Sequence, residues 1–112
     1  MSERLRGAIE TVSGYSLRHG EAVSIGMVAE ARLSETLSLA DKGLSDRIAK
    51  VLSGLGLPAK IPEDLPHDEL IRAMQFDKKK ASGVTRFSLP IEIGRVQVNV
   101  EVKELELLFK EN

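Results

Sequence analysis

His19 is the residue whose type and position most favour chemistry, because it opens the string His19-Gly20-Glu21 just before a long apolar segment. A neutral imidazole is a common ligand of Zn²⁺ and similar divalent metals, and here it would stand near the positive end of a helix. The alternative is an exposed loop histidine followed by an acid that suits the first helical turn. A catalytic zinc needs three protein ligands, and the only other histidine, His67, lies beyond a proline-rich connection. The residue types permit a metal ligand at His19 but do not complete a metal site.

A second candidate is the charged run Asp77-Lys78-Lys79-Lys80. Lysine binds a phosphate or a carboxylate as a point charge, so one of these side chains could hold an anionic substrate. A run of cations that follows a helix is also typical of a solvated helix end, where positive charge is stabilising. Residue types alone leave both interpretations open.

Four amphipathic helices are expected to position these residues, over residues 2–13, 19–39, 46–52 and 67–76, because apolar side chains recur there at helical spacing. Gly14 is a suitable stop for the first helix, and Ser45 is a suitable N-cap for the third. In the third helix Ile48, Val51 and Leu52 should point inward. The charged run 77–80 is expected to follow the fourth helix.

The helix over 19–39 is the longest of the four and should form the centre of the domain. One face carries small and apolar residues, namely Ala22, Ile25, Gly26, Ala29, Leu33 and Leu37. Small side chains in its first half allow another helix or a ligand to come close. Glu10, Glu30 and Glu35 lie among other charges, so we assign them to surface pairs.

Beyond the helices the apolar spacing changes to a period of two. Residues 86–93 and 96–102 alternate as β-strands do, with Gly94-Arg95 between them, so the two runs predict a β-hairpin. Pro90 cannot donate to a ladder and should lie on an edge strand or at a break. Residues 104–109 are expected to form one or two helical turns. The fold class is therefore mainly α, a helical bundle with one β-hairpin.

Length and composition limit the classes of protein further. The chain has 112 residues, of which 42% are hydrophobic, so we expect residues 1–112 to form a single domain. A formal net charge of −1 argues against a nucleic-acid partner, whose phosphates need an excess of cations. The absence of cysteine excludes thiolate metal ligands and disulfides. We find no secretory or membrane segment, and we expect a cytoplasmic protein with no membrane partner.

Several strings taken together resemble 3-dehydroquinate synthase. They are Ala8-Ile9-Glu10, Ser13-Gly14-Tyr15, the run from His19 to Met27, Asp77-Lys78-Lys79, the run from Arg86 to Pro90, and Ile93-Gly94. Their order and spacing are similar to those of the family's C-terminal domain over about residues 8–110. The resemblance implies a lyase of the shikimate pathway and of aromatic amino acid biosynthesis. Such an enzyme eliminates phosphate from a seven-carbon phosphorylated keto acid and closes the ring to give 3-dehydroquinate, using NAD and a divalent metal, zinc or cobalt.

The resemblance also implies roles for individual residues. His19 matches the metal ligand of the family's His-Gly-Glu motif, where a Lewis acid stabilises a developing alkoxide. Lys78 or Lys79 matches its substrate-binding lysine; we favour Lys78, and Lys79 stays open. The family's NAD-binding domain precedes this region, so the resemblance places no cofactor-binding residue in this chain.

The chain departs from the family just before Ala8. Arg6 and Gly7 stand in the place of a Gly-His pair, and residues 1–5 contain neither of the family's two histidines. We therefore expect that this chain lacks the N-terminal domain and holds no complete set of catalytic residues. We also expect that the chain alone binds neither NAD nor metal tightly and does not turn over substrate. We also expect self-association through apolar surface that the N-terminal domain would cover. The alternatives are a related sugar-phosphate cyclase or glycerol-type dehydrogenase domain, and a non-catalytic binding or assembly module.

Overall fold

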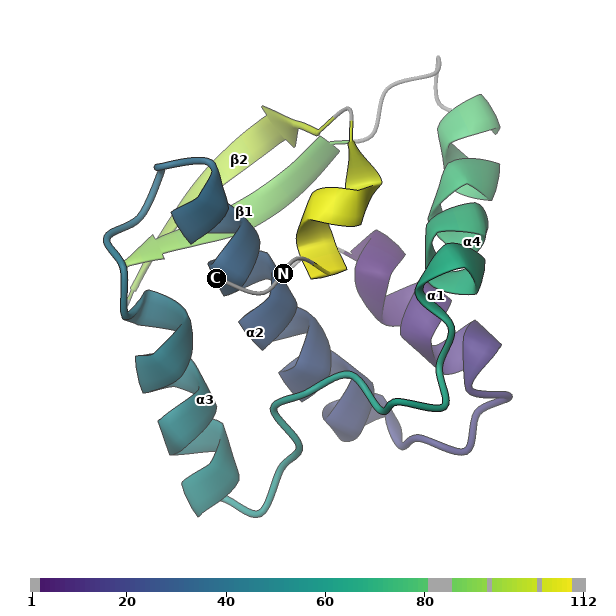
Figure 1. Cartoon of the computed structure of the whole chain (residues 1–112), viewed down its shortest axis with the longest axis horizontal. Helices are drawn as coiled ribbons and strands as arrows, with labels where there is room; N and C mark the ends of the chain where they lie inside the picture. The colour runs from purple at the N-terminus through teal and green to yellow at the C-terminus, as the bar shows by residue number, and fades with distance from the viewer. Residues whose placement is uncertain (1–2, 81–85, 93, 103, 110–112) are drawn as a thin grey trace.

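The computed structural model describes residues 3–80, 86–92, 94–102 and 104–109. The order of elements is α1 (Glu3–Val12), α2 (His19–Thr36), α3 (Leu44–Gly54), α4 (His67–Lys80), β1 (Arg86–Glu92), β2 (Arg95–Glu101) and the 3₁₀ helix η1 (Leu105–Phe109). The two strands pair as an antiparallel hairpin. This architecture confirms the predicted fold class, a mainly helical domain with one hairpin (Figure 1).

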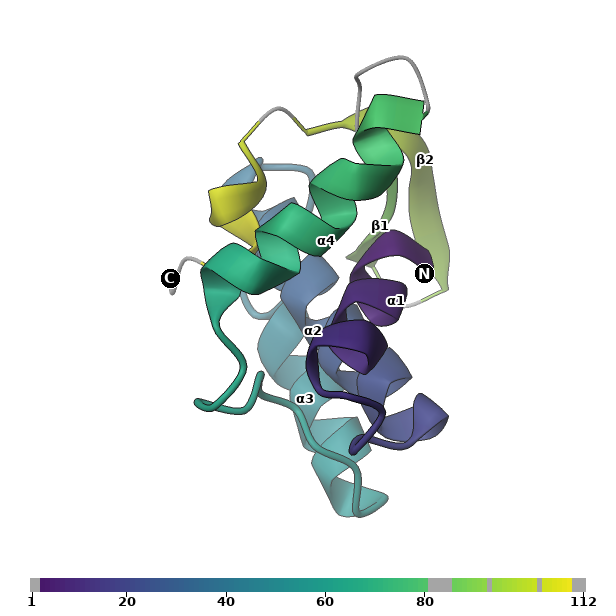
Figure 2. The ribbon, with the colours of Figure 1, turned by 90° about the vertical axis from the view of Figure 1, so that its right-hand side faces the viewer.

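Helix α2 lies at the centre and contacts α1, α3, β1 and η1. Figure 2 shows α4 crossing the side of the molecule, where it packs on α1 and η1. The core is apolar and takes buried side chains from α1, α2, α4, β1 and η1, and Val100 of β2 packs against it partly buried. Its largest fully buried members are Leu5, Ile9, Ile25, Leu33, Leu70, Met74, Phe87, Leu89 and Leu108. The stripe predicted on the long helix is the face that enters this core, because residues spaced by three and four share one side of a helix.

The hairpin is asymmetric in burial. Phe87 and Leu89 of β1 are buried against the helices, whereas Val96 and Val98 of β2 are 53% and 60% exposed. Pro90 lies opposite Val96, next to a register shift between Pro90 and Glu92. Both strands of a two-stranded sheet are edges, so the edge position expected for Pro90 is confirmed. Residue 93, which the sequence places in the first strand, lies outside the described residues.

Several predicted helix boundaries differ from the structure, and the long helix already ends at Thr36 rather than at residue 39. Helix α3 begins at Leu44 after Gly43, so Ser45 lies within its first turn and is not the N-cap. Helix α4 continues to Lys80, so the charged run forms its last turns and does not follow it. No glycine or proline interrupts residues 77–80, and lysine propagates a helix well.

The inward face predicted for α3 is also partly wrong. Leu52 is buried, but Val51 is 63% exposed and Leu55, one turn further along, is 71% exposed. Helix α3 is apolar on more than one side, and packing against α2 covers only part of it. An apolar stripe of α3 is therefore left on the surface.

Within the described residues, no helix is both long and apolar enough to cross a bilayer.

Candidate functional site

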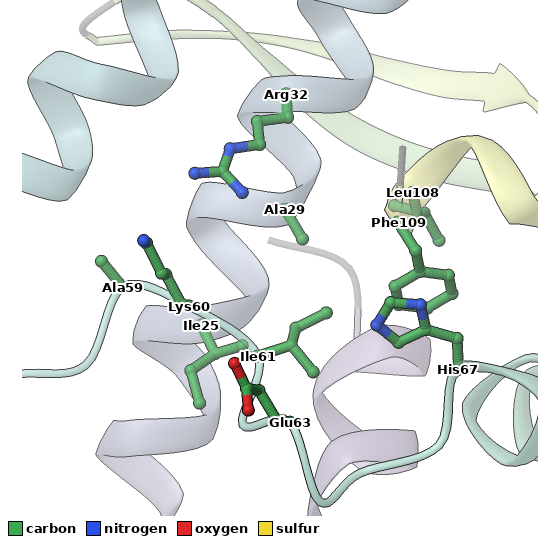
Figure 3. Close-up of a pocket in the computed structure, with 10 residues that line it drawn as sticks. All are labelled: Ile25, Ala29, Arg32, Ala59, Lys60, Ile61, Glu63, His67, Leu108 and Phe109. Carbon is green, nitrogen blue, oxygen red and sulfur yellow. The ribbon is translucent and has the colours of Figure 1, made fainter. Parts of the chain in front are cut away.

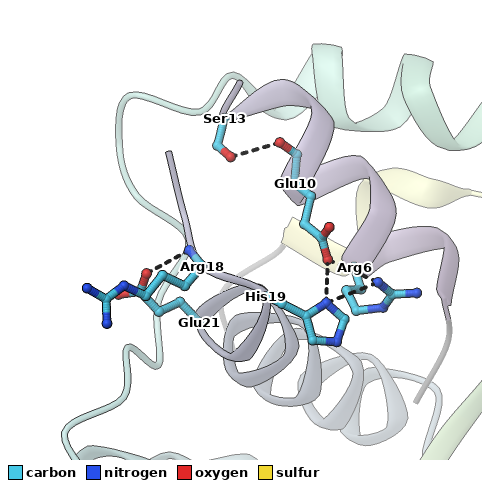
Figure 4. A network of polar contacts seen from close by, with 6 residues as sticks. All are labelled: Arg6, Glu10, Ser13, Arg18, His19 and Glu21. Carbon is cyan, nitrogen blue, oxygen red and sulfur yellow. Dashed lines mark hydrogen bonds and ion pairs between the residues drawn. The ribbon is translucent and has the colours of Figure 1, made fainter. Parts of the chain in front are cut away.

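His19 is the first residue of α2, and its imidazole lies beside α1 (Figure 4). Its Nδ1 atom is 3.0 Å from Oε1 of Glu10, and its side chain is 66% exposed. A carboxylate can only accept a hydrogen bond and a guanidinium can only donate one, so Nδ1 carries the hydrogen when it donates to Glu10 but not when it accepts from Arg6. The contact with Glu10 is the shorter of the two, and we take it as the one that sets the tautomer. The Nε2 atom then keeps its lone pair, which is the form in which a histidine binds a metal.

Arg6 completes this cluster from the same helix as Glu10. Its Nη1 atom is 3.0 Å from Oε1 of Glu10 and 3.3 Å from Nδ1 of His19. Arg6 and Glu10 are four residues apart, which places them on one face of α1. The surface pair predicted for Glu10 is thus confirmed, and its second partner is the candidate metal ligand.

The charge state of Glu10 follows from these neighbours. Partial burial by itself raises the pKa of its carboxyl, but the hydrogen bonds from His19 and Arg6 and the positive charge of Arg6 outweigh that effect and lower the pKa overall. Glu10 is therefore ionised at neutral pH and is a competent acceptor for the imidazole of His19.

The turn between α1 and α2 makes this contact possible. Gly14 and Tyr15 both have positive φ, 65° and 63°, and the Tyr15 amide donates to the Glu10 carbonyl at 2.9 Å. The chain therefore reverses directly after α1, which confirms the stop expected at Gly14 and returns His19 to the side of Glu10. Glu21 accepts the Arg18 amide at 2.8 Å, so it caps the helix as the first-turn acid that the sequence predicts.

The described residues do not assemble a metal site around His19. Within residues 3–80, 86–92, 94–102 and 104–109 there is no group of three or more His, Asp or Glu side chains that could hold an ion. His67 begins α4, is exposed, and stacks on Phe109.

Lys78 and Lys79 lie in the last turns of α4. Their side chains lie outside the part of the chain that is described, so their role in substrate binding stays a prediction. The helix to which they belong packs directly on α1, the helix that carries Glu10.

The surface position assigned to Glu30 needs correction, and Glu35 has a contact that the sequence does not predict. Glu30 is fully buried in α2, at 0% exposure, beside a pocket lined by Met27, Ile48, Ser88, Pro90 and Val96. Glu35 accepts the Ser45 amide at 2.6 Å and so caps the start of α3 across the turn. Helical spacing predicts neither feature. The burial of Glu30 depends on elements distant in the chain from α2, and the contact of Glu35 depends on the turn that follows α2.

Comparison with known families assigns this domain. Residues 5–80 match the family described as 3-dehydroquinate synthase C-terminal. The match covers more than half of the chain, so the chain belongs to the C-terminal domain family of 3-dehydroquinate synthase.

Individual relatives agree with that assignment. The chain is 40% identical over 101 residues to the 3-dehydroquinate synthase of Thermodesulfovibrio yellowstonii, covering 89% of this chain and 28% of that protein. It is 43% identical over 96 residues to that of Nostoc sp., covering 85% and 26%. It is 40% identical over 100 residues to that of Pyrococcus abyssi, covering 89% and 29%. The chain thus spans less than a third of the relatives it matches.

Proposed function

We propose that this chain provides the metal-binding and substrate-binding side of a 3-dehydroquinate synthase active site, with His19 as a metal ligand through Nε2. The observation that carries the proposal is the contact of His19 Nδ1 with Glu10, a carboxylate that can accept the imidazole hydrogen and so leave the Nε2 lone pair for a metal. A carboxylate behind a ligating histidine orients the ring and makes it a better ligand. The reaction would be phosphate elimination and ring closure on a phosphorylated keto acid in the cytoplasm.

The donors described here fit one ligand of a metal and not a whole site. His19 supplies one nitrogen, and the Arg6 guanidinium 3.3 Å from its Nδ1 adds positive charge that opposes a nearby cation. By the family resemblance, two further ligands and the NAD domain belong to the preceding part of the enzyme. When bound, zinc or cobalt would act as a Lewis acid on a substrate oxygen. Lys78 or Lys79 would neutralise an anionic group of the substrate.

A chimaera tests this proposal directly. It joins the Thermodesulfovibrio yellowstonii relative to this chain at Ala8, so that the relative supplies everything upstream, including the family's Gly-His string. We expect the chimaera to release phosphate and form 3-dehydroquinate, with NAD and Zn²⁺ both required. A substrate panel of other sugar phosphates and of glycerol distinguishes the related cyclases and dehydrogenases. A folded chimaera that releases no phosphate would contradict the proposal and favour a non-catalytic module.

The exposed stripe of α3 leads to a prediction about the isolated chain. Val51 and Leu55 lie one turn apart and are 63% and 71% exposed, a surface that a second copy of the chain can cover. We expect concentration-dependent self-association in sedimentation velocity. Replacing both with lysine should give a monomer and change the free energy of unfolding by less than about 1 kcal/mol. Lys50→Glu on the same helix is the control; a wild-type chain that stays monomeric at high concentration would refute the prediction.

A further inference from the structure

A pocket of about 200 Å³ lies between α2, the connection from α3 to α4, and η1 (Figure 3). Its floor is apolar, formed by Ile25 and Ala29 of α2 together with Ile61 of the connection. An engineered apolar cavity of about 150 Å³ holds benzene, so this volume suits a ligand with a single ring. On α2 the pocket begins at Ile25, six positions after His19 or about 9 Å along the axis, and its cationic end at Arg32 lies about 20 Å from His19.

One wall of the pocket is positive. The guanidinium of Arg32 and the ammonium of Lys60 extend toward each other on the same side of the pocket (Figure 3). Among the described residues neither side chain has an ion-pair partner within 4.0 Å. Two cations that converge without a counter-ion repel each other, and an anion between them removes that repulsion.

The opposite wall is aromatic. His67 stacks on Phe109 with ring centroids 4.6 Å apart and an interplanar angle of 18°. A flat ring beside this pair gains apolar contact area at little entropic cost, because the two protein rings already support each other. The pocket therefore has a cationic end and an aromatic end with an apolar floor between them.

The backbone that carries Lys60 is held against α2. The hydroxyl of Ser24 donates a hydrogen bond to the carbonyl of Pro58, two residues before Lys60. This bond ties the backbone of the connection to the helix that carries Arg32. One carboxylate, Glu63, also lines the pocket, and its charge weakens the positive field.

We infer that this pocket binds a small carboxylate that carries one flat apolar ring, with the carboxylate between Arg32 and Lys60 and the ring against His67 and Phe109. The ligand class follows from the two ends of the pocket. Arginine pairs with a carboxylate in a planar, two-bonded geometry, and lysine adds a point charge. This site is separate from the proposed metal ligand and does not depend on the proposed function.

Titration of the full chain with benzoate, followed by amide NMR shifts, tests the inference. We expect saturable binding with a dissociation constant on the order of 1 mM, as befits so small a ligand, and shifts centred on Ala29 and Ile61. Benzyl alcohol lacks the charge and inorganic phosphate lacks the ring, so each should bind at least about fivefold more weakly. Equal binding of either probe, or no saturation by benzoate, would overturn the inference.

Four variants test the roles of the walls. Lys60→Gln and Arg32→Gln should each weaken benzoate binding by about fivefold, whereas Glu63→Gln should strengthen it by about twofold because it removes a like charge. Lys50→Gln, an exposed lysine on α3, is the matched control and should change nothing. Lys60 and Glu63 are both exposed, so their variants keep the fold even where Arg32→Gln does not. Unchanged affinity in both of these exposed variants would contradict the site.

Discussion

His19→Ala in the chimaera joined at Ala8 is expected to lower phosphate release by about 10³-fold or more. A metal that stabilises a developing alkoxide contributes several kcal/mol to the barrier, and each 1.4 kcal/mol or so is a factor of about ten. The side chain is 66% exposed and makes no apolar contact in the core, so its removal should leave the fold intact. The measurement is turnover at saturating substrate, with thermal melting to confirm folding.

Glu10→Gln tests the role of Glu10 in supporting the imidazole ring separately from the role of His19 as a metal ligand. Glutamine keeps an acceptor oxygen near Nδ1 of His19 but removes the negative charge, so the imidazole becomes a weaker ligand. Losses of about 10- to 100-fold are typical when such a supporting group is changed. This variant should raise the zinc concentration needed for half-maximal activity, a readout that a merely structural role would not move.

A matched control and a contradicting result complete this prediction. Lys42→Ala changes an exposed residue of the turn before α3 and should leave turnover and zinc dependence unchanged. His19→Ala with the activity and zinc dependence of the unmodified chimaera would show that His19 is not a metal ligand. Loss of activity with unaltered zinc affinity would give it a different role, and that too would contradict the assignment.

Much of the fold can be predicted from sequence, because it rests on local periodicity. The stripe that includes Ile25, Ala29 and Leu33 predicts both the long helix and the face that enters the core. The change to a period of two predicts the hairpin, and Gly14 predicts the end of the first helix. His19 could likewise be placed at the start of α2 from sequence alone.

The parts that sequence does not predict depend on how elements pack. Glu30 looks like a surface acid on α2, but it is buried beside residues of α3 and of the hairpin. Val51 looks like a core residue, but α2 covers only the neighbouring face of α3. The contact of Glu10 with His19 depends on the angle between α1 and α2, which two residues with positive φ set. Local patterns therefore give the elements, and their angles decide which polar groups meet.

Phe87→Ala is expected to lower the free energy of unfolding by about 3–5 kcal/mol. Phe87 is 1% exposed and is the largest fully buried side chain of the chain as described, and it joins the hairpin to the helical core. The substitution loses the free energy gained by burying the ring, and it leaves a cavity that the rigid backbone of β1 cannot fill. Since a domain of this size is stable by about 5–15 kcal/mol, the loss is a large part of the total.

Val98→Ala is the matched control, which shows whether the loss of stability comes from the packing of the hairpin on the helices. Val98 is in the paired strand but is 60% exposed, so its truncation should cost less than about 0.5 kcal/mol. Urea unfolding followed by circular dichroism measures both values. Equal destabilisation by the two variants would show that β1 does not pack on α2 as described. Because α2 also carries His19 at its first residue, a loosened hairpin should lower the temperature at which the chimaera loses activity before it changes turnover at low temperature.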